Sequence, residues 1–164
     1  MLAEVLMTLI LTSGAFAAGA AIPARHSCDG ADVSPALAWS GAPAGTAAWA
    51  LIAEDPDAPG GSWVHWVLFN LPAGTTALPE GVAKTERLEA LGGALQGRND
   101  FRRIGYGGPC PPPGRAHRYF FRLYALNAAL PLQAGATRQE VERAMRGHVV
   151  GEATLMGTYA RQRR

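Results

Sequence analysis

The sequence has few cysteines. Cys28 and Cys110 are the only two among its 164 residues. Two cysteines this far apart are neither the framework of a disulfide-rich domain nor a zinc site. We therefore expect two reduced thiols. A bridge within the chain or between subunits stays open, because the sequence does not give the geometry.

Charge of one sign is also in short supply. The 15 Lys and Arg residues nearly balance the 13 Asp and Glu residues, the net charge is +2, and Lys84 is the only lysine. Nucleic-acid binding calls for a concentrated basic stripe, so no nucleic-acid partner is expected. The last arginines, Arg161, Arg163 and Arg164, are expected to be a solvated tail.

Long hydrophobic runs are missing too. Residues 1–11 are apolar, but the run is too short to span a bilayer, so integral membrane association is not expected. Ala15-Phe16-Ala17 resembles a signal-peptidase site, yet no Lys or Arg precedes Arg25. We expect residues 1–11 to be a first strand of a cytoplasmic protein, with export through an N-terminal signal as the alternative.

What the sequence does have is a globular composition rich in turn residues. Apolar residues make up 48% and charged residues 17%, and there are 20 glycines and 12 prolines. A chain of this length buries enough surface to fold without a metal or a disulfide. No repeat or linker divides it, so residues 1–164 are expected to form one domain, and no cofactor is implied.

Three segments are expected to be strands. Residues 47–54 and 63–71 are apolar at both alternating positions, which is typical of a strand buried on both faces. Residues 117–126 alternate instead. One face of that strand carries His117, Tyr119, Phe121 and Leu123, and the other carries Arg118 and Arg122.

One helix is expected near the C-terminal end. Thr137 and Glu140 have the spacing of a capping box, and Gly151 would end the helix. Residues 154–160 would be a final strand or a docked segment. The fold class is therefore mainly β, a sandwich or roll with one helix. The apolar stripe of that helix would be Val141, Ala144, Met145, His148 and Val149.

Two residues of the buried strands could carry chemistry. Asp55 follows the first of them, and the adjacent proline ends the strand and directs the carboxylates of Asp55 and Asp57. His65 lies inside the most apolar strand, where a buried imidazole needs a partner such as a carboxylate. Each has a purely structural alternative, Asp55 as the cap of a turn and His65 as a satisfied core histidine.

The loop at 105–114, which runs into His117, is the third candidate feature. Gly107 and Gly108 let the backbone approach a ligand closely, and their N–H groups could face an anion. Four prolines stiffen the loop, and a rigid structural turn is the alternative. Together the three features predict a pocket for a small anion at one end of a sheet.

A binding protein is favoured over an enzyme. No G-x-S-x-G motif occurs, and Cys110, between Pro109 and Pro111, is the only candidate nucleophile. One alternative is a small hydrolase that uses Asp55, His65 and His117 as acid and base. Another is a zinc site of two His and one Asp, but these residues lack the close spacing of common zinc motifs, so no metal is expected.

These segments resemble the phosphatidylethanolamine-binding protein family, in particular its bacterial and archaeal Raf-kinase-inhibitor-like branch. The resemblance covers nearly the whole chain. Its most specific parts are DPDAP at 55–59 and GYGGPCPPPGRAHRY at 105–119. Further matching segments are IPARHSCDGADVSPALAW at 22–39, WVHWVLFNLP at 63–72, GRNDF at 97–101 and AMRGHVVGEATLMGTYAR at 144–161.

The resemblance implies a large antiparallel sheet packed on a smaller one, with peripheral helices and a pocket for a phosphate-like group. The ligand would be a phospholipid headgroup or a phosphorylated residue. His65 and His117 would donate to its oxygens, and Asp55 would fix an imidazole tautomer. By motif position the ligand-binding residues would be Asp55, His65, Gly108, Pro109 and His117, with Asp57, Trp63 and Tyr119 beside or behind them.

The resemblance also suggests a regulatory role, as an inhibitor of a protein kinase or a protease, and a homodimer. The family members with such inhibitor roles are mostly longer eukaryotic proteins. This chain has the compact prokaryote-like form, so the identity of a partner does not transfer. His148 matches a helix position common in this branch and is assigned to packing or to an interface.

Overall fold

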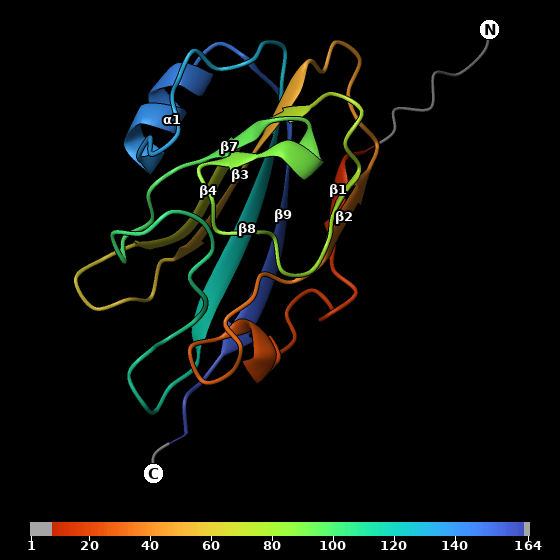
Figure 1. Cartoon of the computed structure of the whole chain (residues 1–164). Helices are drawn as coiled ribbons and strands as arrows, with labels where there is room; N and C mark the ends of the chain where they lie inside the picture. Colours follow the sequence, from red (N-terminus) through yellow and green to blue (C-terminus); the bar gives the residue numbers. More distant parts are fainter. Residues whose placement is uncertain (1–7, 163–164) are drawn as a thin grey trace, which may run out of the picture.

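The computed structural model describes residues 8–162, which form two antiparallel sheets and one α-helix, α1 (Arg138–Met145). The larger sheet has the order β6 (Arg87–Leu88), β7 (Ala94–Gln96), β4 (Trp63–Pro72), β3 (Ala48–Asp55), β8 (His117–Leu126), β9 (Val149–Tyr159). The smaller one has the order β1 (Ile10–Thr12), β2 (Leu37–Ser40), β5 (Ala77–Leu78), and two short 3-10 helices span Ala24–His26 and Glu89–Leu91. This architecture confirms the predicted mainly β fold (Figure 1).

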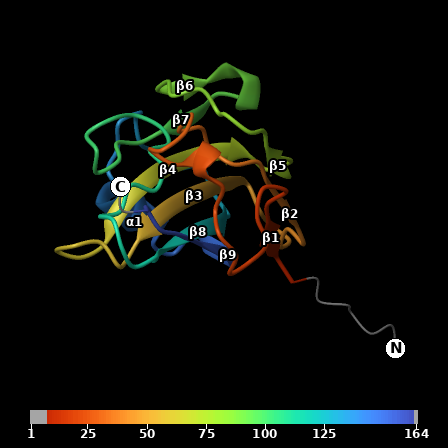
Figure 2. The same cartoon turned by 90° about the horizontal axis from the view of Figure 1, so that it is seen from below.

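The larger sheet is covered on both faces. One face packs against the smaller sheet through an apolar cluster that includes Trp39, Trp49 and Trp66. The other face packs against α1, through Val141 and Met145 among others. Figure 2 shows α1 and the smaller sheet on opposite sides of the larger one. All residues of β3 are therefore buried, as its apolar pattern predicts.

Three strand ends meet at one edge of the larger sheet. Asp55 ends β3 and pairs with Trp63, which begins β4. His117 begins β8, the neighbour of β3 on its other side. The alternation predicted for 117–126 is confirmed, because His117 and Tyr119 are buried while Arg118 is exposed. In Figure 1 these ends lie in the lower half of the molecule, where the loop before β8 and the segment around Cys28 also lie.

The predicted helix begins where expected but ends too early. The Thr137 side chain accepts from the Glu140 N–H, which confirms the predicted start. The helix ends at Met145, and Gly147 then adopts a φ of 80° in the left-handed region that glycine favours. The extension through Val149 to Gly151 is wrong, because β9 begins at Val149 and pairs with β8.

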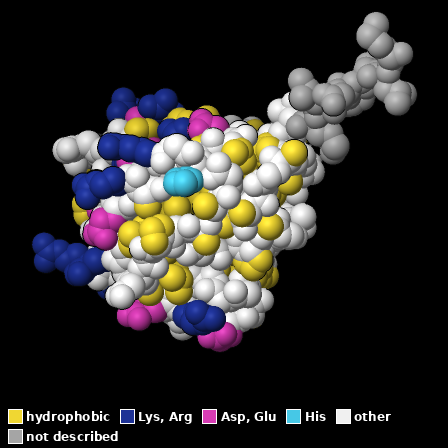
Figure 3. All heavy atoms as spheres, turned by 90° about the horizontal axis from the view of Figure 1, so that it is seen from above, with side chains coloured by type: hydrophobic (Ala, Val, Ile, Leu, Met, Phe, Trp, Pro, Cys, Tyr) yellow, Lys and Arg dark blue, Asp and Glu magenta, His cyan; other side chains and the backbone are white. Residues whose placement is uncertain are grey.

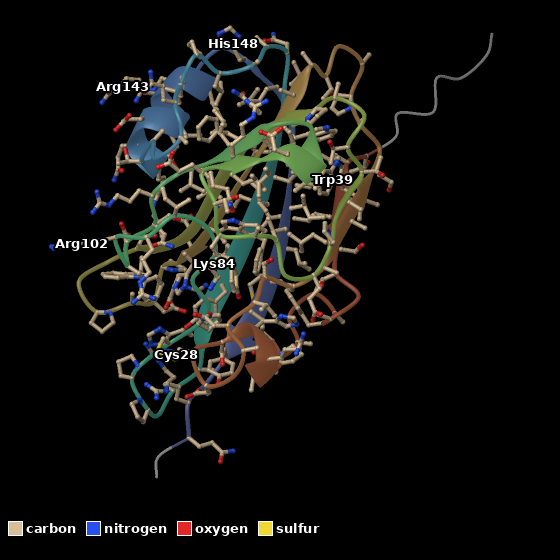
Figure 4. All side chains as sticks on the ribbon, viewed as in Figure 1. Cys28, Trp39, Lys84, Arg102, Arg143 and His148 are labelled. Carbon is tan, nitrogen blue, oxygen red and sulfur yellow. A yellow bond between two sulfur atoms is a disulfide. The ribbon has the colours of Figure 1, made fainter. Side chains whose placement is uncertain are left out.

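His148 lies outside the helix and is exposed. Its Nδ1 is 2.8 Å from Asn127 Oδ1, so its assignment to core packing is wrong, and an interface role stays a prediction. Arg143, on α1, is exposed as well, and both side chains are labelled in Figure 4. Seen from above the view of Figure 1, basic side chains gather along the margin on the side of α1 (Figure 3).

The structure describes the two ends of the chain only in part. The strand predicted for residues 1–11 is confirmed from Ile10 onward as β1, and residues 1–7 lie outside the described part. The segment 154–160 belongs almost entirely to β9, the strand that was one of its two predicted states. Between residues 8 and 162, no helix has the length and apolar character needed to cross a bilayer.

Cys28 and Cys110 form a disulfide. The expectation of two reduced thiols is therefore wrong. The bridge joins the segment after the first 3-10 helix to the loop before β8, across 82 positions of the sequence. A contact of this range depends on how the sheets assemble, which local sequence patterns do not report.

Candidate functional site

A cavity of about 300 Å³ lies at the edge where β3, β4 and β8 meet. Its polar lining groups come from the ends of these strands. The remaining lining is mostly apolar and comes mainly from loops. The strand residues are Asp55, Trp63, His65, His117 and Tyr119, and the loop residues are Ala58, Pro59, Phe101, Cys110, Pro111 and Pro112.

Asp55 and His117 form a buried pair at the floor of this cavity. His117 Nδ1 donates to Asp55 Oδ2 at 2.7 Å, and both side chains are less than 10% exposed. The other oxygen of Asp55 accepts from the Asp57 N–H at 2.8 Å, which fixes the carboxylate in the turn. The carboxylate thus holds the proton on Nδ1 and leaves His117 Nε2 facing the cavity.

His65 is held by the backbone. Its Nδ1 is 2.6 Å from the Gly107 carbonyl oxygen, and a carbonyl only accepts, so Nδ1 carries the proton. Burial lowers the pKa of His65, which favours the neutral ring. In that ring Nε2 is a lone-pair acceptor. His65 therefore offers a hydrogen-bond acceptor and becomes a donor only when it takes up a proton.

Tyr119 adds a third polar group to the floor. Its hydroxyl is buried and has no hydrogen-bond partner within residues 8–162. Burial and the negative charge of Asp55 raise the pKa of Tyr119, so the hydroxyl keeps its proton. The ring packs edge-on against His65 with the centroids 5.2 Å apart. A buried hydroxyl without a partner is costly in free energy.

Asp57 lies beside the cavity rather than in its lining. Its carboxylate accepts from the Arg118 backbone N–H and from two guanidinium nitrogens of Arg118 at 2.9–3.0 Å. These hydrogen bonds lower the pKa of Asp57 to about 2. The pair ties the loop after β3 to the start of β8, so Asp57 has a structural contact outside the floor.

The loop before β8 does not present the N–H groups that the sequence predicts. Gly107 N–H donates to the His65 carbonyl at 2.9 Å, and Gly108 N–H donates to Asp32 Oδ1 at 2.7 Å. Gly108 and Pro109 are absent from the cavity lining. A Cβ atom on Gly108 would lie 2.1 Å from the His26 carbonyl oxygen, so this glycine serves close packing of the backbone.

Two features of the cavity wall were not predicted from the sequence. Phe101 stands edge-on to both Trp63 and His65, with ring centroids 5.5 and 5.3 Å apart. The Cys28–Cys110 bridge brings Cys110 into the wall. Phe101 belongs to the GRNDF segment, and its place beside an Asn-Asp turn was the only local signal. Of the predicted ligand-binding residues, the structure brings Asp55, His65 and His117 together in one cavity lining and leaves Gly108 and Pro109 out of it. Trp63 and Tyr119, predicted beside or behind these residues, also line the cavity.

Comparison with known proteins gives the same result at several levels. A UPF0098 protein from Methanothermobacter thermautotrophicus is 52% identical over 140 residues, which cover 85% of this chain and 91% of that protein. The crystal structure of a homologue of phosphatidylethanolamine-binding proteins from Chlamydia trachomatis superposes with a TM-score of 0.85 at 40% identity, over 95% of this chain and 99% of the other.

Escherichia coli YbcL, described as a member of the mammalian PEBP family, superposes with a TM-score of 0.87 at 34% identity, over 94% of this chain and 99% of that one. The sequence profile of the phosphatidylethanolamine-binding protein family matches residues 12–160, which include both sheets apart from the first two residues of β1. The chain therefore belongs to the phosphatidylethanolamine-binding protein family.

Proposed function

We propose that the cavity binds a small phosphate-type oxyanion together with a proton. The observation that supports this is the pair of anchored imidazoles. His65 and His117 each engage Nδ1 with a protein oxygen, so Nε2 of each ring is left to the ligand. A neutral ring accepts and an imidazolium donates. A monoprotonated phosphate ester can donate its O–H to one ring and accept from the other.

The floor gives the ligand a defined orientation. Tyr119 has a proton to donate and no partner within the described chain. Among residues 8–162 no arginine or lysine lines the cavity, so the positive charge that faces the anion would come from proton uptake by an imidazole. The apolar rim of Trp63, Phe101 and the prolines would pack against the organic substituent of the ligand.

A regulatory role would use the same chemistry. A phosphorylated side chain of a protein kinase or protease is a phosphate monoester, and so is phosphoethanolamine, the free form of a phospholipid headgroup. Trp63 is 37% exposed at the rim and would contact whatever carries the phosphate. Titration with phosphate, phosphoethanolamine and phosphotyrosine separates these sources through the effect of the substituent.

The test is calorimetric titration with inorganic phosphate and phosphoethanolamine at pH 6 and pH 8, in buffers of different ionisation enthalpy. We expect saturable binding that is tighter at pH 6, with proton uptake, and a loss of roughly tenfold or more in affinity for His117→Ala. Acetate tests whether any carboxylate suffices. Absence of binding, or binding that takes up no proton, contradicts the proposal.

The hydrolase alternative is tested on the same samples. In the described part of the chain no serine or threonine lines the cavity, and the Cys110 sulfur is held in the disulfide. If the wild type hydrolyses p-nitrophenyl phosphate and His65→Ala does not, the protein is an enzyme rather than a binding protein. We expect binding without turnover.

A further inference from the structure

The disulfide between Cys28 and Cys110 lies at the surface of the molecule, in the walls of two cavities. Cys28 and Cys110 are both exposed. Cys110 lines the ligand cavity, and both cysteines line a second cavity of about 260 Å³ that shares Phe101 and Cys110 with the first. The disulfide is thus part of the wall that separates the two cavities. Figure 4 shows Cys28 at the end of the molecule where the loops around the site lie.

The wall next to the bridge has few other attachments. Before it, the loop is held by Gly107 N–H, Gly108 N–H and the Pro109 carbonyl, which accepts from the Cys28 N–H at 3.0 Å. Residues 111–113 are prolines without N–H groups, and the next backbone hydrogen bond, among residues 8–162, comes from Gly114 to the Arg161 carbonyl. Besides the burial of Pro111, the bridge is therefore what anchors residues 110–113.

The two sulfur atoms differ in their surroundings. Arg161 Nη1 lies 3.9 Å from Cys110 Sγ, and Arg161 is itself oriented by an ion pair with Asp29. A guanidinium group stabilises a thiolate, and a sulfur that is stabilised as thiolate leaves more readily in thiol–disulfide exchange. No hydrogen-bond donor contacts Cys28 Sγ in the described part of the chain. The geometry favours attack on Cys28 with departure of Cys110.

We propose that Cys28–Cys110 is a thiol–disulfide exchange site for dithiol reductants and that its reduction weakens ligand binding. A thiolate of the dithiol attacks Cys28 Sγ, the S–S bond breaks, and its electron pair leaves on Cys110 as a thiolate beside Arg161. The second thiol of the reductant then attacks the mixed disulfide. It releases Cys28, so the dithiol becomes a disulfide, and the two cysteines gain its two electrons and two protons.

The effect on the ligand rests on the proposed function. Reduction frees residues 110–113, three of which line the ligand cavity. Asp55, His65 and His117 stay on their strands, so the floor keeps its hydrogen bonds while the wall loses its order. A ligand then has to order the wall itself, which lowers its affinity.

The exchange site is tested by brief reaction of the native protein with glutathione. The sample is acid-quenched, alkylated and mapped by peptide mass. We expect the glutathione adduct on Cys28 and the free thiol on Cys110, and reduction by dithiothreitol about threefold slower in Arg161→Gln. Arg115→Gln, a charge change at an exposed position of the same loop, should react like the wild type. An adduct mainly on Cys110, or no reduction short of unfolding, overturns the proposal.

Control of the cavity is tested by phosphate titration of oxidised and dithiothreitol-reduced protein. We expect Kd to rise about fivefold or more on reduction. Cys28→Ser/Cys110→Ser, shown to be folded by NMR, should match the reduced protein without reductant. Equal Kd values for the oxidised and the reduced protein would show that the disulfide does not affect ligand binding. If the oxidised protein binds no phosphate, both the proposed function and the proposed effect of reduction on binding are overturned. The exchange site is judged by the glutathione result alone.

Discussion

The two walls of the ligand cavity are built on different principles. The strand wall (Asp55, His65, His117 and Tyr119) lies on β3, β4 and β8, where strand pairing fixes each residue. The loop wall (Phe101 and residues 110–112) consists of apolar side chains without regular structure. The first provides the polar groups that could recognise a ligand, and the second closes the space around them.

The difference shows where rigidity comes from in each wall. The strand wall is stabilised by a buried sheet with apolar clusters on both faces. The loop wall depends on a few contacts between segments that are far apart in sequence, among them the disulfide and the hydrogen bond from Gly108 N–H to Asp32. Substitutions that change only a few atoms at those contacts should therefore lower the free energy of unfolding strongly.

Loss of the disulfide should have the largest effect. In Cys28→Ser/Cys110→Ser we expect the free energy of unfolding to fall by about 4 kcal/mol, because the bridge closes a loop of 82 residues in the unfolded chain. Urea unfolding followed by tryptophan fluorescence measures it. A fall of less than about 1 kcal/mol would mean that the loop wall is anchored by other contacts.

A methyl group on Gly108 should have the next largest effect. In Gly108→Ala the Cβ atom would lie 2.1 Å from the His26 carbonyl oxygen and 2.6 Å from Asp32 Oδ1, so backbone has to move. We expect a loss of about 2 kcal/mol in the free energy of unfolding. Gly74→Ala is the matched control, because nothing lies within 4 Å of its added Cβ. Equal stability of the two variants would contradict the packing role of Gly108.

The strand wall was predictable from the sequence because its signals are local. The period of two places His117 and Tyr119 on one face, and the apolar runs identify β3 and β4 as buried. The end of α1 was not predictable, since His148 and Val149 fit both a helical stripe and a strand. Pairing of Val149 with Leu126, which is non-local, decided in favour of β9.

The loop wall was not predictable for the same physical reason. Gly107 and Gly108 indicate close approach of backbone, but the sequence does not say to what. Their acceptors, His65 and Asp32, come from distant segments. The pairing of the cysteines likewise depends on the assembled fold. The sequence thus predicts which side chains of the strands line the cavity, and the tertiary structure decides which backbone N–H groups are already engaged within the protein.

The pH dependence of stability should show the smallest effect and should depend on the strand wall alone. Burial lowers the pKa of His65, so as pH falls below about 6.5 the unfolded chain takes up a proton before the folded one. The free energy of unfolding should then fall with decreasing pH, with a slope of at most about 1.4 kcal/mol per pH unit.

This window separates His65 from the carboxylates. Glu54, Asp57 and Glu80 have lowered pKa values, so their contributions are lost only at more acidic pH. Urea unfolding between pH 7.5 and 5 should therefore show a flatter profile for His65→Gln than for the wild type. His148→Gln, at an exposed position, should keep the wild-type slope. If the His65 variant keeps that slope too, the ring is not held neutral, and the strand wall then offers the ligand a donor without proton uptake.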